Sequence, residues 1–157
     1  MTGVQTCALP ISQRGGGLDE RLAWALADAL VTSPDPLVFI GMDTPQVTPA
    51  LLAQAVEPLV SGAADATFGM AEDGGFWLLG LHEIDPALVL GVPMSREDTG
   101  AVQLARLYQA GLRVRMLPEL ADVATAGEAE RIAAAAPGSR FAARVRALGP
   151  RALVPAR

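Results

Sequence analysis

Residues 37 to 46 read LVFIGMDTPQ, an apolar run that ends at an acidic side chain. Its first five residues are uniformly apolar and rich in β-formers, which is typical of a strand buried on both faces. Residues 47–60 predict a helix directly afterwards, because Thr48 can cap its start and Pro49 suits a first helical turn. A buried strand followed by a helix is the unit of an α/β sandwich. Asp43 then lies at the carboxyl end of the strand, where open α/β sheets bind ligands.

The rest of the chain continues this alternation. Leucine recurs every four residues across residues 18–30, which indicates the apolar stripe of an amphipathic helix. Further strands are expected at residues 65–70, 75–81 and 113–118. Further helices are expected at residues 98–110, 127–136 and 139–148. We therefore predict an α/β fold, a three-layer α/β/α sandwich with a mostly parallel sheet.

Composition narrows the range of partners. The chain is 51% hydrophobic and 18% charged, with a formal net charge of −5. An acidic balance argues against nucleic-acid binding through phosphate contacts, and no apolar run is long enough for a transmembrane helix. A secretory signal is not recognised either. We expect a cytoplasmic protein with small-molecule ligands and no nucleic-acid or membrane partner; the sequence leaves its oligomeric state open.

The first twelve residues, MTGVQTCALPIS, stand apart from the rest. They resemble the translation of a common sequencing adapter, with eleven consecutive residues matching. Cys7, the only cysteine, falls inside this stretch, so no disulfide, zinc or thiol chemistry is predicted. The expected organisation is a non-native segment at 1–12, one domain at 13–136, and a short helix with a flexible tail at 137–157.

Acidic side chains and glycines gather in two loops next to predicted strands. Asp43 follows the first strand, and Asp73 precedes Gly74 and Gly75 before a later one. An Asp two positions before a Pro is also a common turn. A Gly pair lets a ligand approach the backbone but also simply permits a tight turn. Both interpretations stay open for both loops.

A third candidate lies in LADVAT, residues 120–125. Asp122 and Thr125 come just before a predicted helix. Helix capping explains these side chains as well as a functional role does.

Together these stretches resemble one family. Along the chain, a predicted strand is followed by GMDTP at 41–45, by EDGGF at 72–76 and by ADVAT at 121–125. It is similar to the bacterial glycosyltransferase-A-like family named for arsenosugar-biosynthesis glycosyltransferases, which is also known as a domain of unknown function. The resemblance runs from about Gln13 to Ile132.

The resemblance implies a nucleotide-diphospho-sugar transferase fold and metal-assisted glycosyl transfer from a nucleotide-sugar donor to a small-molecule acceptor. It implies that a divalent ion, Mg²⁺ or Mn²⁺, is held by Asp43. The implied catalytic residues are Asp73 and Asp122, with Asp73 orienting the acceptor or the metal. The implied cofactor-binding residues are Asp43, Thr44, Gly74 and Gly75.

Several features depart from the family pattern, and two of them bear on function. Ala124 stands where the family has a second carboxylate after Asp122. The family's first strand and the basic, Gly-containing loop that holds the nucleotide have no counterpart here, so the domain is expected to be N-terminally truncated. The lost strands should leave one sheet edge unpaired, an aggregation risk, and we expect this chain to be poorly soluble and inactive.

Two other functions remain open. A nucleotidyltransferase that makes a cofactor intermediate shares an Asp-x-Pro after a buried strand, but it would release pyrophosphate. A degenerate, non-catalytic binding domain would bind a nucleotide sugar without turnover.

Overall fold

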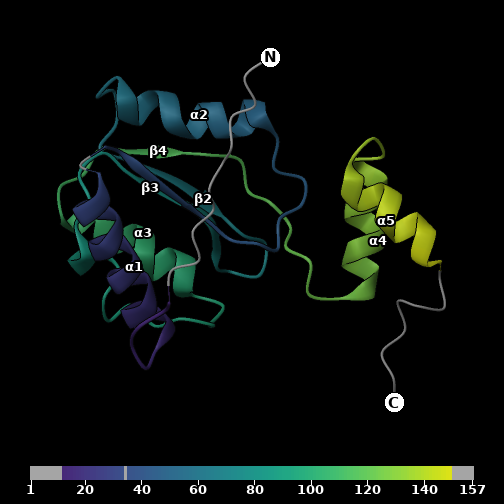
Figure 1. Cartoon of the computed structure of the whole chain (residues 1–157), viewed down its shortest axis with the longest axis horizontal. Helices are drawn as coiled ribbons and strands as arrows, with labels where there is room; N and C mark the ends of the chain where they lie inside the picture. Colours follow the sequence, from purple (N-terminus) through teal and green to yellow (C-terminus); the bar gives the residue numbers. More distant parts are fainter. Residues whose placement is uncertain (1–11, 34, 150–157) are drawn as a thin grey trace.

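The computed structural model describes residues 12–33 and 35–149, with a four-stranded sheet at its centre (Figure 1). The sheet order is β1-β3-β2-β4. The strands are β1 (Leu37–Ile40), β2 (Ala66–Met70), β3 (Phe76–Leu81) and β4 (Val114–Met116). The helices are α1 (Leu18–Thr32), α2 (Pro49–Val60), α3 (Thr99–Gln109), α4 (Ala126–Ala135), α5 (Arg140–Leu148) and the 3₁₀ turn η1 (Pro86–Leu88). Every predicted strand and helix is confirmed within a few residues, whereas η1 was not predicted.

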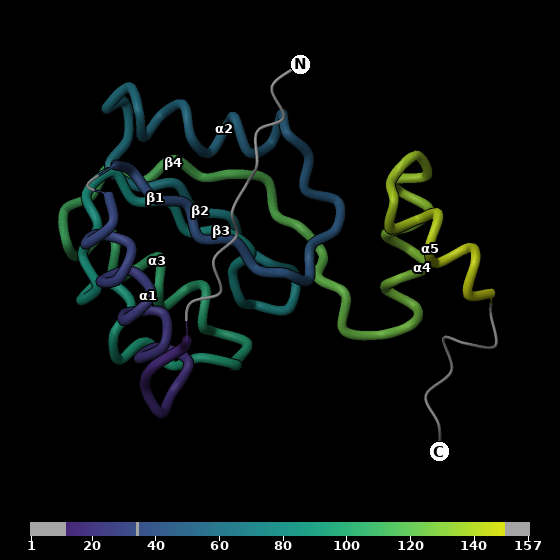
Figure 2. The backbone as a smooth tube through the Cα atoms, viewed as in Figure 1, coloured from purple at the N-terminus to yellow at the C-terminus, as the bar shows by residue number. Residues whose placement is uncertain are grey.

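Helices cover both faces of the sheet, which confirms the three-layer prediction. α2 lies on one face, and α1 and α3 lie on the other (Figures 1 and 2). The expected cap of α2 is present, because the Thr48 side chain accepts a hydrogen bond from the Leu51 N–H. The suspected foreign segment at 1–12 lies almost entirely outside the described residues, so its origin stays a prediction.

The prediction of a mostly parallel sheet is wrong at the level of strand pairing. β3 lies between β1 and β2 and is antiparallel to both, and only β2 and β4 pair in parallel. The reason is the short turn at residues 71–75, which joins β2 to β3 as a hairpin. A tight turn permits antiparallel pairing only, whereas parallel neighbours need a long crossover.

The expectation that residues 37–41 are buried on both faces is also wrong. Leu37, Val38 and Phe39 are half-buried, and Ile40 is 44% exposed. β1 is a terminal strand of the described sheet, so only β3 shields its backbone.

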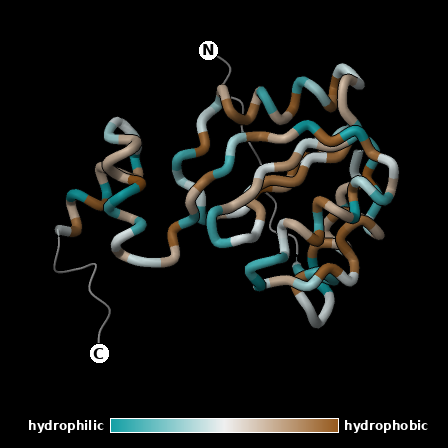
Figure 3. The backbone as a smooth tube through the Cα atoms, turned by 180° about the vertical axis from the view of Figure 1, so that it is seen from behind, coloured by the Kyte–Doolittle hydropathy of each residue, from teal (hydrophilic) through white to brown (hydrophobic). Residues whose placement is uncertain are grey.

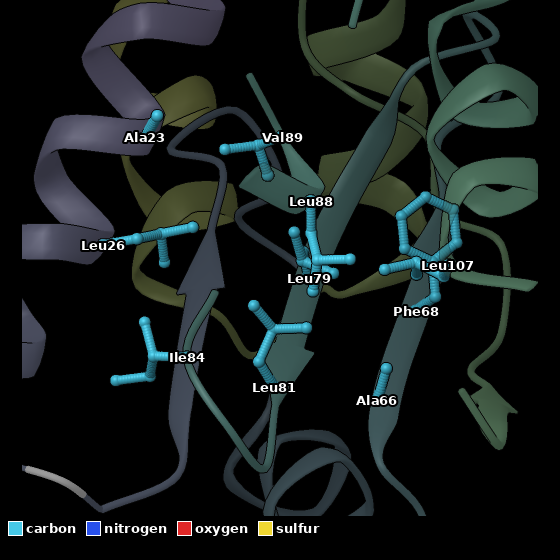
Figure 4. Close-up of a cluster of buried hydrophobic side chains, with 10 residues drawn as sticks. All are labelled: Ala23, Leu26, Ala66, Phe68, Leu79, Leu81, Ile84, Leu88, Val89 and Leu107. Atoms are coloured by element: carbon cyan, nitrogen blue, oxygen red, sulfur yellow. The ribbon is translucent and has the colours of Figure 1, made fainter. Parts of the chain in front are cut away.

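The larger hydrophobic cluster lies between the sheet and the layer of α1 and α3 (Figure 4). It joins Leu26 of α1 and Leu107 of α3 to Phe68 of β2 and Leu79 of β3. Full burial of such side chains contributes about 1.5–3 kcal/mol each.

A smaller cluster under α2 depends on a β-bulge. Gly69 pairs with Leu78 and Met70 pairs with Phe76, so Trp77 is an extra residue in β3. Trp77 and Leu78 are consecutive, yet both belong to the cluster on the α2 side. A bulge redirects a side chain in this way, and such bulges often occur beside functional sites.

α4 and α5 form a hairpin that stands apart from the sheet in both views (Figures 1 and 3). Ala129 and Ile132 of α4 and Ala142 of α5 are buried, and they belong to neither hydrophobic cluster of the sheet. The domain boundary predicted after residue 136 stays a prediction, and the structure adds that the helices on either side of it pack together. Within the described part of the chain, no helix is both long enough and apolar enough to cross a bilayer.

Candidate functional site

One pocket at the end of β1 gathers the acidic side chains that the sequence singled out. We call it the acidic pocket; its volume is about 130 Å³. Its lining includes Asp43, Thr44, Asp73, Gly75, Trp77 and Asp122. Both predicted catalytic residues and the predicted metal ligand therefore lie around one cavity, although they are up to 79 positions apart in the sequence (122 − 43).

Backbone hydrogen bonds bring Asp122 to this place. The chain after β4 continues beside the end of β2, where the Leu120 N–H donates to the Met70 carbonyl at 3.1 Å. The Glu72 N–H donates to the Leu120 carbonyl at 3.0 Å. The Val123 N–H then donates to the Asp43 carbonyl at 2.9 Å. This hydrogen bond joins the loop at residues 120–125 to the loop at residues 41–46.

Gln46 strengthens the same junction and was not singled out from the sequence. Its side-chain Nε2 donates to the Ala121 carbonyl, and its Oε1 is buried without a hydrogen-bond partner in the described part of the chain. A glutamine after a Pro carries no pattern that distinguishes it from a surface residue, so only the tertiary contact reveals it.

Thr44 holds a polar atom that the described residues leave unsatisfied. Its side chain is only 6% exposed and lines the acidic pocket, and its Oγ1 has no hydrogen-bond partner among them. Leaving a buried hydroxyl unpaired costs about 1–3 kcal/mol, so such groups are normally satisfied. A ligand oxygen in the pocket would satisfy it.

The glycine pair divides into two roles. Gly74 has φ +87°, and a Cβ there would lie 1.8 Å from the Glu97 carbonyl oxygen. The close approach at Gly74 is therefore to the chain's own backbone, and its positive φ agrees with the tight turn that the sequence left open. Gly75 lines the acidic pocket, and its N–H donates to Asp73 Oδ1 at 2.8 Å.

The two aromatic residues that follow have different surroundings. Phe76 packs against Phe68 with ring centroids 5.3 Å apart, as expected for a packing residue. Trp77, which the sequence did not single out, is 2% exposed and forms one wall of the pocket. Its indole N–H donates to the Pro118 carbonyl at 3.0 Å.

Thr125 proves to be a helix cap. It forms a capping box with Glu128 at the start of α4. The Thr125 hydroxyl and nearby backbone N–H groups donate to the Glu128 carboxylate and lower its pKa. The capping interpretation is thus confirmed for Thr125, whereas Asp122 faces the acidic pocket.

An ion pair joins α4 to the turn at residues 71–75 that carries Asp73. Arg131 Nη2 lies 2.8 Å from Glu72 Oε2, and this hydrogen bond, followed by the charge of Glu72, raises the pKa of Arg131. The carboxylate of Asp122 acts on Arg131 in the same direction. A positive charge therefore stands beside the acidic pocket.

The described residues contain no group of three or more His, Cys, Asp or Glu side chains arranged to hold a metal ion. The carboxylates of Asp43, Asp73 and Asp122 line the pocket without converging on one point. The metal at Asp43 stays a prediction.

Comparison with known proteins agrees with this fold. A solved structure, described as a "putative nucleotide-diphospho-sugar transferase" from Desulfovibrio desulfuricans G20, is similar with a TM-score of 0.78 and 26% sequence identity. The similarity covers 87% of this chain but 61% of that protein, so the chain spans less than two thirds of its length. The predicted nucleotide-diphospho-sugar transferase-like fold is confirmed. No protein among the curated sequences matches the chain.

A family model matches as well. Residues 4–96 fit the family described as "Uncharacterized protein conserved in bacteria (DUF2064)", a range that includes Asp43 and Asp73. Neither match bears on arsenosugars, and that part of the resemblance stays a prediction. Because the match covers more than half of the 157 residues, the chain belongs to this conserved bacterial family.

Proposed function

We propose that this chain belongs to a glycosyltransferase that moves a sugar from a nucleoside diphosphate to a small-molecule acceptor with the help of a divalent metal. The observation that carries the proposal is the acidic pocket, which is lined by Asp43, Asp73 and Asp122 together with Thr44, whose hydroxyl has no partner among the described residues. The similarity to a protein described as such a transferase supports the donor class.

The donor groups of the pocket fit Mg²⁺ or Mn²⁺. These ions prefer oxygen ligands and are commonly held by one or two carboxylates together with substrate phosphates. Asp43 and one further carboxylate would suffice, because the diphosphate would supply the remaining oxygens. Once bound, the metal would neutralise the charge that develops on the departing nucleoside diphosphate.

The size of the pocket limits what it would hold. Its volume is about 130 Å³, below the range of about 300–1,000 Å³ that is usual for pockets enclosing a whole ligand. We infer that only the sugar and the adjoining phosphate would enter it, with the nucleoside outside.

The chain's own residues would then position the reacting groups. In the transfer, the bond from the sugar C1 to the diphosphate oxygen breaks, and a bond from C1 to the acceptor oxygen forms. The acceptor's hydroxyl proton would pass to a carboxylate. We assign this role to Asp122, because Asp73 Oδ1 already accepts the Gly75 N–H and is held within its turn. The Thr44 hydroxyl would donate a hydrogen bond to an oxygen atom of the nucleotide sugar.

Metal-dependent binding is the first test, because it does not require an identified acceptor. Mn²⁺ binding is measured by electron paramagnetic resonance, with the ion alone and with UDP, GDP, CDP and ADP in turn. We expect at least one diphosphate to bind with Mn²⁺. Asp43→Asn should weaken that binding by about tenfold or more, a loss typical of damage to a metal site.

Asp35→Asn is the matched control, because Asp35 is exposed and does not line the pocket. It should leave binding unchanged. Equal binding to wild type and Asp43→Asn would refute the proposed site.

Thr44→Val separates a ligand role from a structural one. It removes the unpaired hydroxyl while nearly keeping the side-chain shape, so it should stabilise the free chain by up to about 1 kcal/mol. The same variant should weaken binding of the Mn²⁺–diphosphate pair. A loss of stability in urea unfolding would instead show that the hydroxyl is satisfied within the protein.

The reaction products distinguish the proposed glycosyltransferase from the alternative nucleotidyltransferase. A glycosyltransferase releases a nucleoside diphosphate from a nucleotide sugar, whereas a nucleotidyltransferase releases pyrophosphate from a nucleoside triphosphate. Binding without either product, in a version of the protein that spans the whole length of its structural relative, would favour the non-catalytic alternative.

A further inference from the structure

We propose that Arg131 binds the diphosphate of the nucleotide sugar, and that its guanidinium leaves Glu72 when this ligand arrives. The inference rests on the proposed function, because it adds a binding residue to the same site. It requires only the diphosphate, so it applies equally to the alternative nucleotidyltransferase.

Arg131 reaches from α4 to the turn at residues 71–75. Its Nη2 lies 2.8 Å from Glu72 Oε2 and its Nη1 lies 3.4 Å from Glu72 Oε1, so both guanidinium nitrogens contact one carboxylate. Glu72 stands between Ala71 and Asp73 in the sequence, and both of these neighbours line the acidic pocket. The guanidinium is therefore held next to the part of the pocket that carries Asp73.

Asp122 places the same guanidinium beside a second part of the pocket. Asp122 lines the pocket from the loop that leads into α4. The hydrogen bond from Arg131 to Glu72 is the main cause that raises the pKa of Arg131, and the charge of Asp122 acts in the same direction. Because such an effect falls off with distance, Asp122 is near Arg131. Arg131 thus adjoins two of the loops that form the pocket.

A diphosphate in this pocket requires a positive charge besides the metal. Asp43, Asp73 and Asp122 already line the pocket, and the ligand would add further negative charge. One divalent ion does not balance three carboxylates together with a diphosphate. Sites that stabilise a departing phosphate commonly combine a metal with Arg or Lys for this reason.

The positions of the other ion pairs favour Arg131 for this role. The chain has no Lys, so its permanently charged basic side chains are all Arg. Of the four ion pairs in the described part of the chain, only the pair of Arg131 with Glu72 involves the turn at residues 71–75. Arg113 pairs at the opposite end of β2 from the pocket, and Arg96 pairs within its own loop.

The ion pair with Glu72 is readily exchanged for a ligand. The side chains of Arg131 and Glu72 are 55% and 49% exposed. Exposed ion pairs contribute little to stability, because both partners can interact with water instead. A diphosphate presents paired oxygens like those of a carboxylate but with more negative charge, and Arg binds phosphate through two parallel hydrogen bonds. The exchange therefore favours the ligand.

Binding of the preformed complex of Mn²⁺ with inorganic pyrophosphate tests the proposal, because this probe carries the diphosphate without a nucleoside. Isothermal titration calorimetry measures its dissociation constant with the whole chain. Arg131→Met should weaken binding about tenfold, since it removes charged hydrogen bonds to the ligand. Glu72→Gln should strengthen binding about twofold to fivefold, because it frees the guanidinium. A purely structural ion pair would make both changes act in the same direction.

Each variant has a control with the same change of charge. Arg144→Met removes a positive charge from α5 of the same hairpin, and Glu130→Gln removes a negative charge next to Arg131 on α4. Arg144 and Glu130 are exposed, and neither lines the acidic pocket. Both controls should change the dissociation constant by less than about twofold at physiological ionic strength. Arg131→Lys keeps the charge without the paired donors, so its binding should lie between that of wild type and Arg131→Met.

Three results would overturn the inference, provided that circular dichroism shows a cooperative thermal transition for each variant. The first is equal binding by wild type, Arg131→Met and Glu72→Gln; if Asp43→Asn still weakens binding, the proposed function stands without this inference. The second is weaker binding in both Arg131→Met and Glu72→Gln, because Arg131 then acts only through its ion pair. The third is a wild-type chain that binds neither pyrophosphate nor any nucleoside diphosphate with Mn²⁺, which would overturn the proposed function as well.

Discussion

Gly74 shows how a single position is constrained by residues distant in the sequence. Its positive φ requires a glycine-like backbone, and the carbonyl of Glu97 occupies the space of a Cβ. The Gly100 N–H also donates to the Gly74 carbonyl at 2.8 Å, so the start of α3 rests on this turn. The turn that holds Asp73 is therefore fixed from two sides.

Gly74→Ala should destabilise the fold by about 3 kcal/mol, because the strain of a left-handed alanine adds to a backbone clash. Gly91→Ala is the matched control, since Gly91 has φ +78° and nothing within 4 Å of its would-be Cβ. It should cost only about 1 kcal/mol. Urea unfolding measures the loss of unfolding free energy in both variants. Equal losses would show that the contact with Glu97 is unimportant.

Asp65 and Arg113 form the best-connected ion pair of the described chain. Arg113 donates from its side chain at 2.7 and 2.9 Å and from its backbone N–H at 2.8 Å. These bonds, led by the side-chain ones, lower the pKa of Asp65 from 3.8 to about 2.

A lowered pKa in the folded state means that folding favours the ionised carboxylate. The stabilisation is therefore complete above about pH 4 and is lost as the pH falls towards 2. Asp65→Asn should flatten the decline of the unfolding free energy across this range. Arg113→Met should flatten it in part, because it removes the side-chain donors and keeps the backbone N–H. An unchanged decline in both variants, measured by urea unfolding from pH 5 downwards, would contradict this assignment.

Among the helices, α4 and α5 depend mainly on each other and on their own caps. The capping box at Thr125 and the ion pair of Arg131 with Glu72 hold the hairpin near the acidic pocket. Few contacts join it to the sheet, so it is expected to open as a separate unit.

Thr125→Ala should remove an N-cap worth about 1 kcal/mol. We expect faster amide hydrogen exchange across residues 127–148, with little change at β2 and β3. Thr48→Ala is the comparison, because that cap begins α2, which packs on the sheet, and its loss should lower the global unfolding free energy. Global destabilisation by Thr125→Ala would show that the hairpin and the sheet unfold together.

Considered as a whole, the chain has a net negative charge, and the described part of its sheet ends in an apolar strand, β1. Its isoelectric point is about 4.8. Net charge keeps molecules apart in solution, and this repulsion disappears near the isoelectric point. The aggregation expected from an unpaired sheet edge should therefore be strongest there.

Light scattering between pH 4 and pH 8 measures this association. We expect a maximum near pH 4.8 that falls as the net negative charge grows. Ile40→Lys places a charge on the edge strand β1 and should lower the maximum by more than Val56→Lys, a change on α2 at a residue of similar exposure. A pH-independent signal would contradict the role of net charge.

Local pattern was sufficient for the positions of the strands and helices, because periodicity and caps act over a few residues. It also identified the acidic loops, since Asp43, Asp73 and Asp122 each adjoin a strand or helix end. Which strands become neighbours depends on long-range pairing, and the antiparallel insertion of β3 and the exposure of β1 followed from that alone. The unpaired hydroxyl of Thr44, the Gln46 contact and the wall formed by Trp77 likewise arise only where distant segments pack together, because burial and hydrogen-bond partners are properties of the packed chain.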